Sequence, residues 1–378
     1  MRWNELRIQP HTPGGPEVPG GPGSPEGTGT PGSTGTPDGR PATTAPAPAL
    51  FERGAITRSF DTPGFRGMTF FEVHARSVIN RVPDSSRVPF RWTINPYRGC
   101  SHACVYCFAR NTHTYLDLDA GHDFDSKIVV KVNAPALVRK ELNSRKWQGE
   151  HIAMGTNVDV YQRAEGKYQL MPGILQALLD ARNPYSILTK GTLILRDLDL
   201  LLASAEVTDV GLSVSVGCAD EDLWRAVEPG TPSPRRRLGV CATLSEHGLR
   251  CGVLMGPVVP FLSDSPAQLE STVRQIAEAG ATHVSPIVLH LRPGAREWFL
   301  AWLGEHHPDL VPRYRGLYGS RAYAPKDYQQ RITEQVRELA ARYHVGRGSP
   351  PPSQRTWRRA RPAAIPPAEP AEEQLTLL

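Results

Sequence analysis

The sequence lacks any long hydrophobic stretch and carries little net charge. Its longest nearly unbroken apolar run, residues 252–262, is too short to span a bilayer. The first residues show no apolar segment after their basic residues, as a signal peptide would. We therefore expect a cytoplasmic, soluble protein with no membrane partner. The formal charge of +5 permits an acidic partner such as nucleic acid but does not require one.

Cysteine is also scarce, with only six in 378 residues. In a reducing compartment, cysteines more often bind metals or act in catalysis than form disulfides. Three of them, Cys100, Cys104 and Cys107, lie within eight positions, whereas the other three are scattered and do not suggest a second metal cluster. Of these, we expect Cys241 and Cys251 to be core residues.

The composition changes along the chain and predicts its domain organisation. Residues 10–48 are dominated by Pro, Gly, Ser and Thr, and residues 346–373 are similar. Such segments cannot offset the entropy of ordering, so we expect disordered tails at 1–49 and 346–378. Between them we predict an N-terminal extension at 50–89 that packs on a barrel at 90–345.

Short β-branched runs alternate with amphipathic stretches through the barrel region. The runs predict six strands, at 90–95, 151–157, 185–190, 210–216, 251–259 and 283–291. The stretches predict helices at 134–147, 169–182, 195–206, 234–248 and 265–280, with a closing helix at 324–343. Repeated βα units imply a parallel sheet covered by helices, so the fold class is α/β, a partial (β/α)6 TIM-like barrel. In such folds the carboxyl ends of the strands carry the chemistry.

The three clustered cysteines follow the first predicted strand with the spacing C-x3-C-x2-C. A structural zinc site usually needs four protein ligands, and His102 or His113 offers a fourth. This alternative is a zinc-stabilised nucleic-acid-binding protein without redox chemistry. Iron–sulfur clusters usually take four thiolates, so three leave one iron open to a small molecule.

The spacing, with the aromatic Tyr106 just before the last cysteine, resembles the signature of the radical SAM superfamily. The resemblance implies a [4Fe–4S] cluster whose open iron binds S-adenosylmethionine (SAM). One electron, from a flavodoxin- or ferredoxin-type donor, then cleaves SAM to methionine and a 5′-deoxyadenosyl radical. It implies an enzyme, lyase- or transferase-like, acting on an unidentified substrate, with DNA or RNA repair or modification one candidate.

Looser similarity through residues 90–300 resembles the branch that contains spore photoproduct lyase and uncharacterised bacterial relatives. The resemblance places SAM contacts at successive strand ends: Tyr106, Thr156, Asn157, Lys190, Ser213 and Ser215. Lys190 is equally a surface lysine after a strand, and the serines equally satisfied groups of a barrel interior. Catalytic candidates on the same face are Asp159, Tyr161, Glu165, Glu228 and Arg292, with Gln162 beside them. Helix capping and loop ion pairs explain these residues as well.

One position departs from that branch. Spore photoproduct lyase has a hydrogen-donating cysteine at the end of its second strand, where this sequence has Met154–Gly155. Repair of the same thymine lesion is therefore in doubt. Cys218, after the fourth strand, is an alternative thiol, although a small buried cysteine is the commoner explanation.

Three further segments bear on partners. The basic run at 232–238 is predicted to be a solvated helix face. The Arg-rich segment 347–361, with Trp357, suits nucleic-acid contact or a solubilising tail. The terminal QLTLL, Gln374 to Leu378, resembles the peptide by which bacterial DNA-processing proteins bind the sliding clamp, and docking onto the chain's own barrel is the alternative. A cluster protein that lost catalysis and acts as a clamp-bound sensor is a third function.

Overall fold

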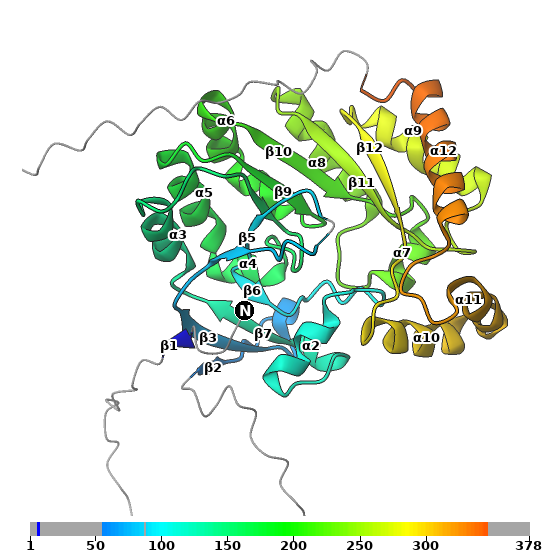
Figure 1. Ribbon diagram of the computed structural model, residues 1–378, viewed down its shortest axis with the longest axis horizontal. Helices are drawn as coiled ribbons and strands as arrows, with labels where there is room; N and C mark the ends of the chain where they lie inside the picture. The colour runs from blue at the N-terminus through cyan, green and yellow to red at the C-terminus, as the bar shows by residue number, and fades with distance from the viewer. Residues whose placement is uncertain (1–5, 8–54, 87, 347–378) are drawn as a thin grey trace, which may run out of the picture.

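The computed structural model describes residues 6–7, 55–86 and 88–346 (Figure 1). The predicted tails therefore lie outside the described residues, apart from residues 6–7 and 346. The Arg-rich segment and the QLTLL peptide lie outside them as well. Within the described residues, no helix is both long and apolar enough to cross a membrane.

A seven-stranded sheet forms the centre of the molecule, with six parallel strands in sequence order. They are β5 (Trp92–Ile94), β8 (Ile152–Met154), β9 (Tyr185–Thr189), β10 (Val210–Ser215), β11 (Cys251–Val258) and β12 (Val284–Val288). β4 (Ile79–Arg81) adds to β5 in antiparallel orientation, so β4 and β12 are the two edges. All six predicted strands are confirmed, and the fold is the expected α/β arrangement, with its sheet open rather than closed between β4 and β12.

Helices follow the strands and cover the outside of this sheet (Figure 1). The six predicted helices are confirmed as α3 (Ala134–Leu142), α5 (Leu170–Asp180), α6 (Leu198–Val207), α8 (Pro234–Glu246), α9 (Pro266–Glu278) and α12 (Lys326–Arg342). Their ends follow local chemistry. Ser233 and Ser265 cap α8 and α9, each followed by proline at the first helical position, and the backbone of Gly280 has φ +69° after α9.

The two faces of the parallel strands differ in burial. On β9 and β10, Tyr185, Ile187, Leu212 and Val214 are fully buried among helix side chains. Residues of the opposite face, such as Leu188 and Ser213, are only half-buried. The face turned away from the helices is therefore the accessible inner face of the partial barrel, and it carries both predicted serines.

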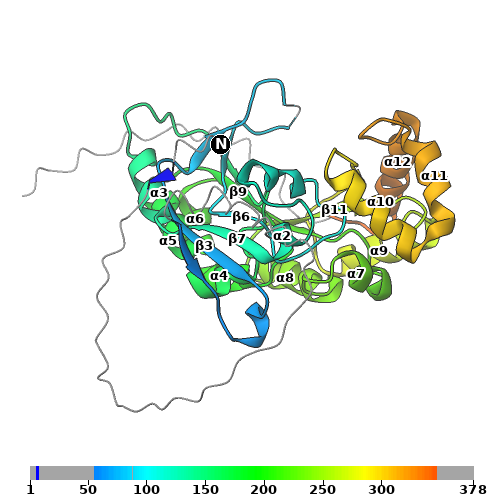
Figure 2. The ribbon, with the colours of Figure 1, turned by 90° about the horizontal axis from the view of Figure 1, so that it is seen from below.

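A second, smaller sheet was not predicted. It consists of β1 (Leu6–Arg7), β2 (Ile56–Arg58), β3 (Thr69–Ala75), β6 (Tyr97–Arg98) and β7 (Lys127–Lys131). β3 from the N-terminal extension runs parallel to β7, which follows the cysteine loop (Figure 2). Phe60 and Phe70 pack against Tyr168 at the end of α4 (Arg163–Tyr168), and Phe65 packs against both phenylalanines. This cluster joins the small sheet to the barrel.

Other elements complete the chain around the strand ends. They are α2 (His122–Ser126), α7 (Glu221–Val227), α10 (Ala295–His306), α11 (Val311–Tyr318) and the 3-10 turns η2 (Pro63–Phe65), η3 (Arg110–Thr112), η4 (Thr114–Leu116), η5 (Leu193–Asp197) and η6 (Pro308–Leu310). α12 packs against α9 and β12.

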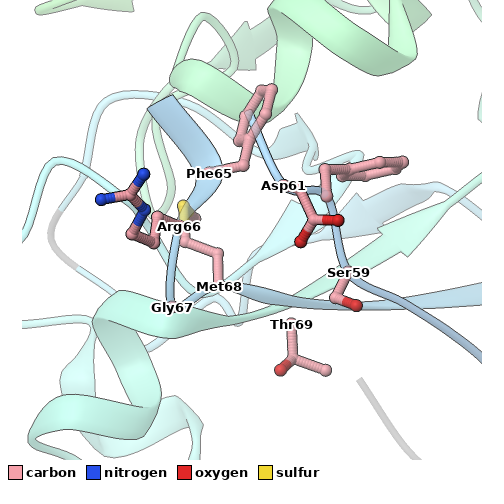
Figure 3. A pocket seen from close by; sticks show the side chains of 8 residues that line it. Ser59, Asp61, Phe65, Arg66, Gly67, Met68 and Thr69 are labelled. Atoms are coloured by element: carbon pink, nitrogen blue, oxygen red, sulfur yellow. The ribbon is translucent and has the colours of Figure 1, made fainter. Parts of the chain in front are cut away.

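A cavity of about 400 Å³ is lined by residues of the segment 59–69 and shares none with the cysteine loop (Figure 3).

Candidate active site

The three clustered cysteines occupy one tightly turned loop after β5 and β6. Gly99 has φ +82°, and a Cβ there would lie 2.8 Å from the His113 ring and 2.9 Å from the Lys127 carbonyl oxygen, so only glycine fits without rearrangement. Two backbone bonds of 3.1 Å, from Ala103 N to Cys100 O and from Cys107 N to Cys104 O, close successive turns. The turns keep all three cysteines on one short segment.

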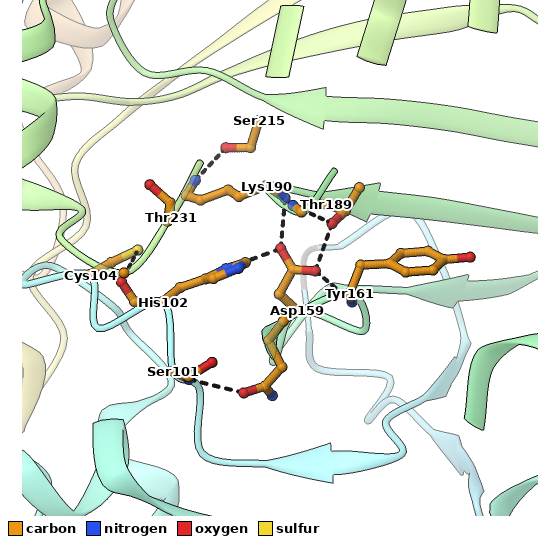
Figure 4. A network of polar contacts seen from close by, with 12 residues as sticks. Ser101, His102, Cys104, Asp159, Tyr161, Thr189, Lys190, Ser215 and Thr231 are labelled. Atoms are coloured by element: carbon orange, nitrogen blue, oxygen red, sulfur yellow. Dashed lines mark hydrogen bonds and ion pairs between the residues drawn. The ribbon is translucent and has the colours of Figure 1, made fainter. Parts of the chain in front are cut away.

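A buried amide braces the loop around Cys100. The Gln162 side chain comes from the segment after β8 and is fully buried. Its Nε2 donates to Gly99 O (3.0 Å), and its Oε1 accepts from Ser101 N (2.9 Å). Figure 4 shows the bond to Ser101. Gln162 therefore fixes the backbone on both sides of Cys100.

A buried guanidinium braces the same loop around Cys104. Arg110 is fully buried, and its Nε and Nη2 donate to Cys104 O at 3.2 and 3.0 Å. Its Nη2 also pairs with both Asp125 oxygens at 2.9 Å, and its guanidinium carbon lies 4.8 Å from the Trp298 ring centre on α10. Arg110 thus ties the loop to α2 and α10.

The environment of the three thiols suits metal binding rather than free thiolates. Burial raises the pKa of Cys100, Cys104 and Cys107, and for Cys100 the nearby Asp159 carboxylate and the other two cysteines raise it further. Buried thiolates need a cation to compensate them, and a bound metal supplies it. The donor set therefore fits an iron–sulfur cluster, although no three His, Cys, Asp or Glu side chains of the described residues are already grouped as a metal site.

Each of the two histidines proposed as a fourth zinc ligand has one ring nitrogen engaged elsewhere. His102 Nδ1 lies 3.4 Å from Asp159 Oδ2. The His113 ring is fully buried, and its Nε2 bonds to Lys127 O at 2.9 Å. Neither ring completes a four-ligand site with the cysteines within the described residues.

Asp159 is the centre of a hydrogen-bond network beside the loop (Figure 4). It accepts from the backbone N–H of Tyr161 (2.9 Å), the Thr189 hydroxyl (2.7 Å) and the backbone N–H of Lys190 (2.6 Å). Burial alone would raise the pKa of Asp159, but His102 and these donors outweigh it and lower that pKa to about 2. The carboxylate is therefore ionised at neutral pH and positions the ends of β8 and β9.

A second network surrounds Glu228, which follows α7. Its Oε2 accepts from Arg237 Nη2 at 2.5 Å, its Oε1 accepts from the Tyr106 hydroxyl, and Lys190 Nζ lies 3.5 Å away. Burial favours a raised pKa, but Arg237 and Lys190 outweigh it, so the pKa of Glu228 is about 2. Lys190 Nζ also donates to Ser215 Oγ at 2.5 Å. Lys190 thus joins the two networks, through its backbone N–H and its ammonium group.

The remaining predicted SAM contacts lie on the same edge of the sheet. Thr156 and Asn157 follow β8 and are half-buried, and Ser213 is half-buried on β10. Ser215 is buried and donates to Gly256 O at 2.9 Å. The structure therefore brings Tyr106, Lys190 and Ser215 together, while the other three stand on neighbouring strand ends.

Two of the catalytic candidates have contacts that hold the scaffold. The Tyr161 hydroxyl donates to Asp197 Oδ2 at 2.9 Å. The Glu165 carboxylate accepts from the backbone N–H groups of Leu170 (3.1 Å) and Met171 (3.0 Å) at the start of α5, and pairs with Arg196 at 2.7 Å. Burial raises the pKa of Glu165. These are the contacts of a helix cap and an ion pair.

Arg292 stands apart from both networks, exposed beyond the end of β12. Its Nη2 donates to the Tyr323 hydroxyl at 2.9 Å, and its guanidinium carbon lies 5.4 Å from the ring centre of Phe108, the residue after Cys107. Arg292 is therefore at the outer rim of the cysteine loop.

The end of β8 carries no thiol, and position 155 accepts no side chain. Met154 is buried, and Gly155 has φ +77°, with a built Cβ only 1.8 Å from Leu188 O. Cys218, immediately after β10, is buried, and burial raises the pKa of its thiol to about 12. Cys241 and Cys251 are fully buried core residues, as predicted.

Sequence reasoning missed the roles of three residues here. The basic run at 232–238 was expected to be solvated; Arg235 and Arg236 are exposed, but Arg237 is buried against Glu228. The helical period could have predicted that Arg237 is buried, because it shares a helix face with the buried Cys241 and Leu244. The sequence places Gln162 beside the catalytic candidates but does not indicate that it holds the cysteine loop. No local pattern marks Arg110.

Comparison with known proteins agrees with this geometry. The family model of the Radical SAM superfamily matches residues 94–285. An uncharacterized protein of Mycobacterium tuberculosis is 47% identical over 317 residues, which cover 83% of this chain and 93% of that protein. One from Methanocaldococcus jannaschii is 33% identical over 174 residues, 46% of this chain and 62% of that protein.

The fold resembles that of a solved lyase. Spore photoproduct lyase complexed with dinucleoside spore photoproduct superimposes with a TM-score of 0.57 at 16% identity, over 73% of this chain and 80% of that one. At this identity the likeness shows the fold alone. The family match covers about half of the chain and includes all three loop cysteines, and family membership implies SAM and a [4Fe–4S] cluster. The chain belongs to the radical SAM superfamily.

Proposed function

We propose that this chain binds a [4Fe–4S] cluster through Cys100, Cys104 and Cys107 and uses it to cleave SAM reductively. The observation that supports this most is the concentration of three thiols in one braced loop, with Cys100 and Cys104 buried and Cys107 half-buried, beside an ionised network at the strand ends. When bound, the cluster supplies the electron that generates a 5′-deoxyadenosyl radical. The protein supplies position, charge and exclusion of water.

The residues around the loop divide these tasks. Lys190 and Ser215 present an ammonium and a hydroxyl next to each other on the inner face, a pair suited to a carboxylate such as that of methionine. Thr156, Asn157 and Ser213 offer polar groups on adjoining strand ends. Asp159 and Glu228, each with a pKa of about 2, stay ionised; Asp159 holds the backbone at the end of β9, and Glu228 holds the Lys190 and Arg237 cations in place. Neither carboxylate has a proton to donate at neutral pH.

We infer that the substrate is a nucleic acid and that the protein works in the cytoplasm. The support is the mild basic charge and the fold shared with an enzyme solved with a dinucleoside lesion. The end of β8 carries Met154 and Gly155 and therefore no thiol, which separates this chain's reaction from one that depends on a cysteine there. Cys218 is the remaining thiol candidate near the strand ends.

Two partners complete the proposal. A low-potential flavodoxin- or ferredoxin-type donor supplies the electron, as the chemistry requires. The QLTLL peptide, Gln374 to Leu378, lies outside the described residues, and we keep sliding-clamp binding as a proposal on its sequence alone.

The test is anaerobic purification followed by reduction in the presence of SAM. We expect iron and labile sulfide in near-equal amounts and release of 5′-deoxyadenosine. Cys104→Ala should abolish both, whereas Cys241→Ala, which removes a buried thiol from α8, should leave both unchanged. A colourless protein with one zinc per chain would contradict the proposal, and a brown protein that releases no 5′-deoxyadenosine would leave only a sensor.

A further inference from the structure

An exposed aromatic surface lies against the outer side of the cysteine loop. We call it the aromatic rim and define it as Phe108, His290, Arg292 and Tyr323. Phe108 is 41% exposed and Tyr323 43% exposed, more than most large rings of the residues that the structure describes. Phe108 directly follows Cys107, which is the least buried of the three loop cysteines. The rim therefore borders the less enclosed side of the candidate cluster site.

The cation of the rim stands between its two exposed rings. The Arg292 guanidinium carbon is 5.4 Å from the Phe108 ring centre, and its Nη2 donates to the Tyr323 hydroxyl at 2.9 Å. Tyr323 takes one of the five N–H donors that a guanidinium carries. The His290 and Tyr323 ring centres are 4.5 Å apart. The rim thus places flat aromatic faces next to a guanidinium that can form two parallel hydrogen bonds.

The part of the rim that carries His290 and Tyr323 is held by backbone contacts rather than by a loose loop. His290 and Tyr323 form an antiparallel bridge, and Leu291 N donates to Ala322 O at 2.8 Å. Arg296, on the first turn of α10, donates to Arg321 O at 3.0 Å and to Gly319 O. A ring fixed in this way loses little conformational entropy when a ligand stacks on it.

We propose that the aromatic rim binds single-stranded nucleic acid, with a base stacked on Phe108 or Tyr323 and a backbone phosphate paired with Arg292. This inference rests on the proposed function. The rim would bind the proposed nucleic-acid substrate next to the candidate cluster site. Every nucleobase has a π-face, so stacking on two rings binds strands with little sequence preference. Arginine pairs with phosphate through two parallel N–H bonds.

The competing occupant is the electron-donor protein. A specific protein interface buries roughly 800 Å² per partner, with a well-packed centre. Four residues of the rim instead match one nucleotide unit, an aromatic face next to a cation. We therefore commit to the nucleic acid and treat donor docking as an outcome of the test.

Binding of a short fluorescein-labelled oligothymidylate to the purified full chain, followed by anisotropy, tests the rim. Phe108→Ala and Tyr323→Ala should each weaken binding by about tenfold, while Phe108→Tyr and Tyr323→Phe should keep it, because stacking needs only the ring. Arg292→Gln should lower the slope of log affinity against log salt by about 0.7, the value of one phosphate contact on a single strand.

Matched controls lie elsewhere on the surface. Tyr115→Ala removes a ring that is 65% exposed on η4, and Lys167→Gln removes a cation that lies 4.8 Å from the Phe60 ring, away from the cysteine loop. Both should retain wild-type affinity. Equal losses in the controls, or unchanged affinity in the rim variants, would overturn the proposal; unchanged affinity with slower cluster reduction by a flavodoxin would reassign the rim to the electron donor.

The two proposals fail separately. If the wild-type protein releases 5′-deoxyadenosine but the rim variants bind the oligonucleotide normally, the rim is wrong and the radical chemistry stands. If the rim variants lose binding but the wild type never releases 5′-deoxyadenosine, the binding surface stands and the enzyme proposal falls.

Discussion

The two ends of the parallel strands bury different kinds of polar group. At the carboxyl ends, Asp159, Lys190, Glu228 and Arg237 form linked charged networks with little exposed surface. At the amino ends, the buried polar side chains of the described residues, such as Asn183 and Thr208, are neutral amides and hydroxyls. Asn183 accepts from Trp147 Nε1 at 2.7 Å and donates to the carbonyls of Glu150 and Pro184, just before β8 and β9.

This difference separates stability from function within one sheet. Neutral hydrogen bonds satisfy buried backbone at modest cost, whereas buried charges are expensive to desolvate and are often no more stabilising than apolar residues. A fold that needed only stability would use the neutral solution at both ends. Charges confined to the carboxyl ends, next to three thiols, indicate that this end is arranged to bind a charged ligand.

Glu228→Gln should produce the largest loss. The variant leaves Arg237, only 1% exposed at its side chain, without its carboxylate, and removes the nearest anion from Lys190. Breaking a buried pair from one side costs about 3–5 kcal/mol. Urea denaturation of the purified protein measures it.

The double variant Glu228→Gln with Arg237→Met is the control for this loss. Removing both partners should restore much of the stability, because no charge of the pair stays buried. A Glu228→Gln protein as stable as the wild type would remove the contrast between the two ends.

Gln162→Leu and Asn183→Leu compare one chemical change at opposite ends. Each replaces a fully satisfied buried amide, and each should cost about 1–3 kcal/mol because backbone groups lose their partners. Only Gln162→Leu should also weaken iron retention, by about 10- to 100-fold against a chelator, since its amide fixes the backbone around Cys100.

The readouts are urea denaturation for stability and, for the site, iron content with the electron paramagnetic resonance signal of the reduced protein. Gln162→Glu retains the acceptor for Ser101 N and should keep more iron than Gln162→Leu. Equal iron loss in the Asn183→Leu protein would show that general destabilisation, and not the brace, releases the metal.

The barrel was predictable from the sequence because its signals are local. Each strand is a short apolar run between turn residues, and α8 and α9 begin with Ser-Pro caps that the sequence displays directly. The small sheet was missed because β3 pairs with β7, and the paired residues, such as Thr69 and Lys127, are 58 positions apart along the chain. Nothing in either segment alone specifies such a long-range partner.

The site was predictable where the spacing of side chains along the sequence carries the information. The cysteine spacing marks the loop, and alternation on β10 places Ser213 and Ser215 on one face. The braces were not predictable, because Gln162 and Arg110 act through backbone carbonyl and N–H groups of distant residues, and backbone groups leave no trace in side-chain patterns.

Acid should weaken the carboxyl end before the amino end. The pKa of Asp159 is about 2, below its ordinary value near 3.8, so on acidification the unfolded chain takes up the proton first. Its stabilisation, about 2 kcal/mol, is complete above about pH 5 and is lost as the pH falls toward 2. Urea midpoints from pH 7 to pH 3 should therefore fall less steeply for Asp159→Asn than for wild type, whereas Asn183→Leu should keep the wild-type slope.

An exposed ion pair should show the smallest effect and so sets the lower limit of the comparison. Arg225 on α7 pairs with Glu221 at 2.9 Å and Asp222 at 2.7 Å, close to the 2.5 Å between Arg237 and Glu228, but all three side chains are largely in water. Water screens both partners and solvates whichever remains, so Arg225→Gln should cost no more than about 0.5 kcal/mol by urea denaturation. If this substitution lowers the free energy of unfolding as much as Glu228→Gln does, then distance and not burial determines what these ion pairs contribute. The buried pairs at the carboxyl ends would then be no different energetically from pairs on the protein surface.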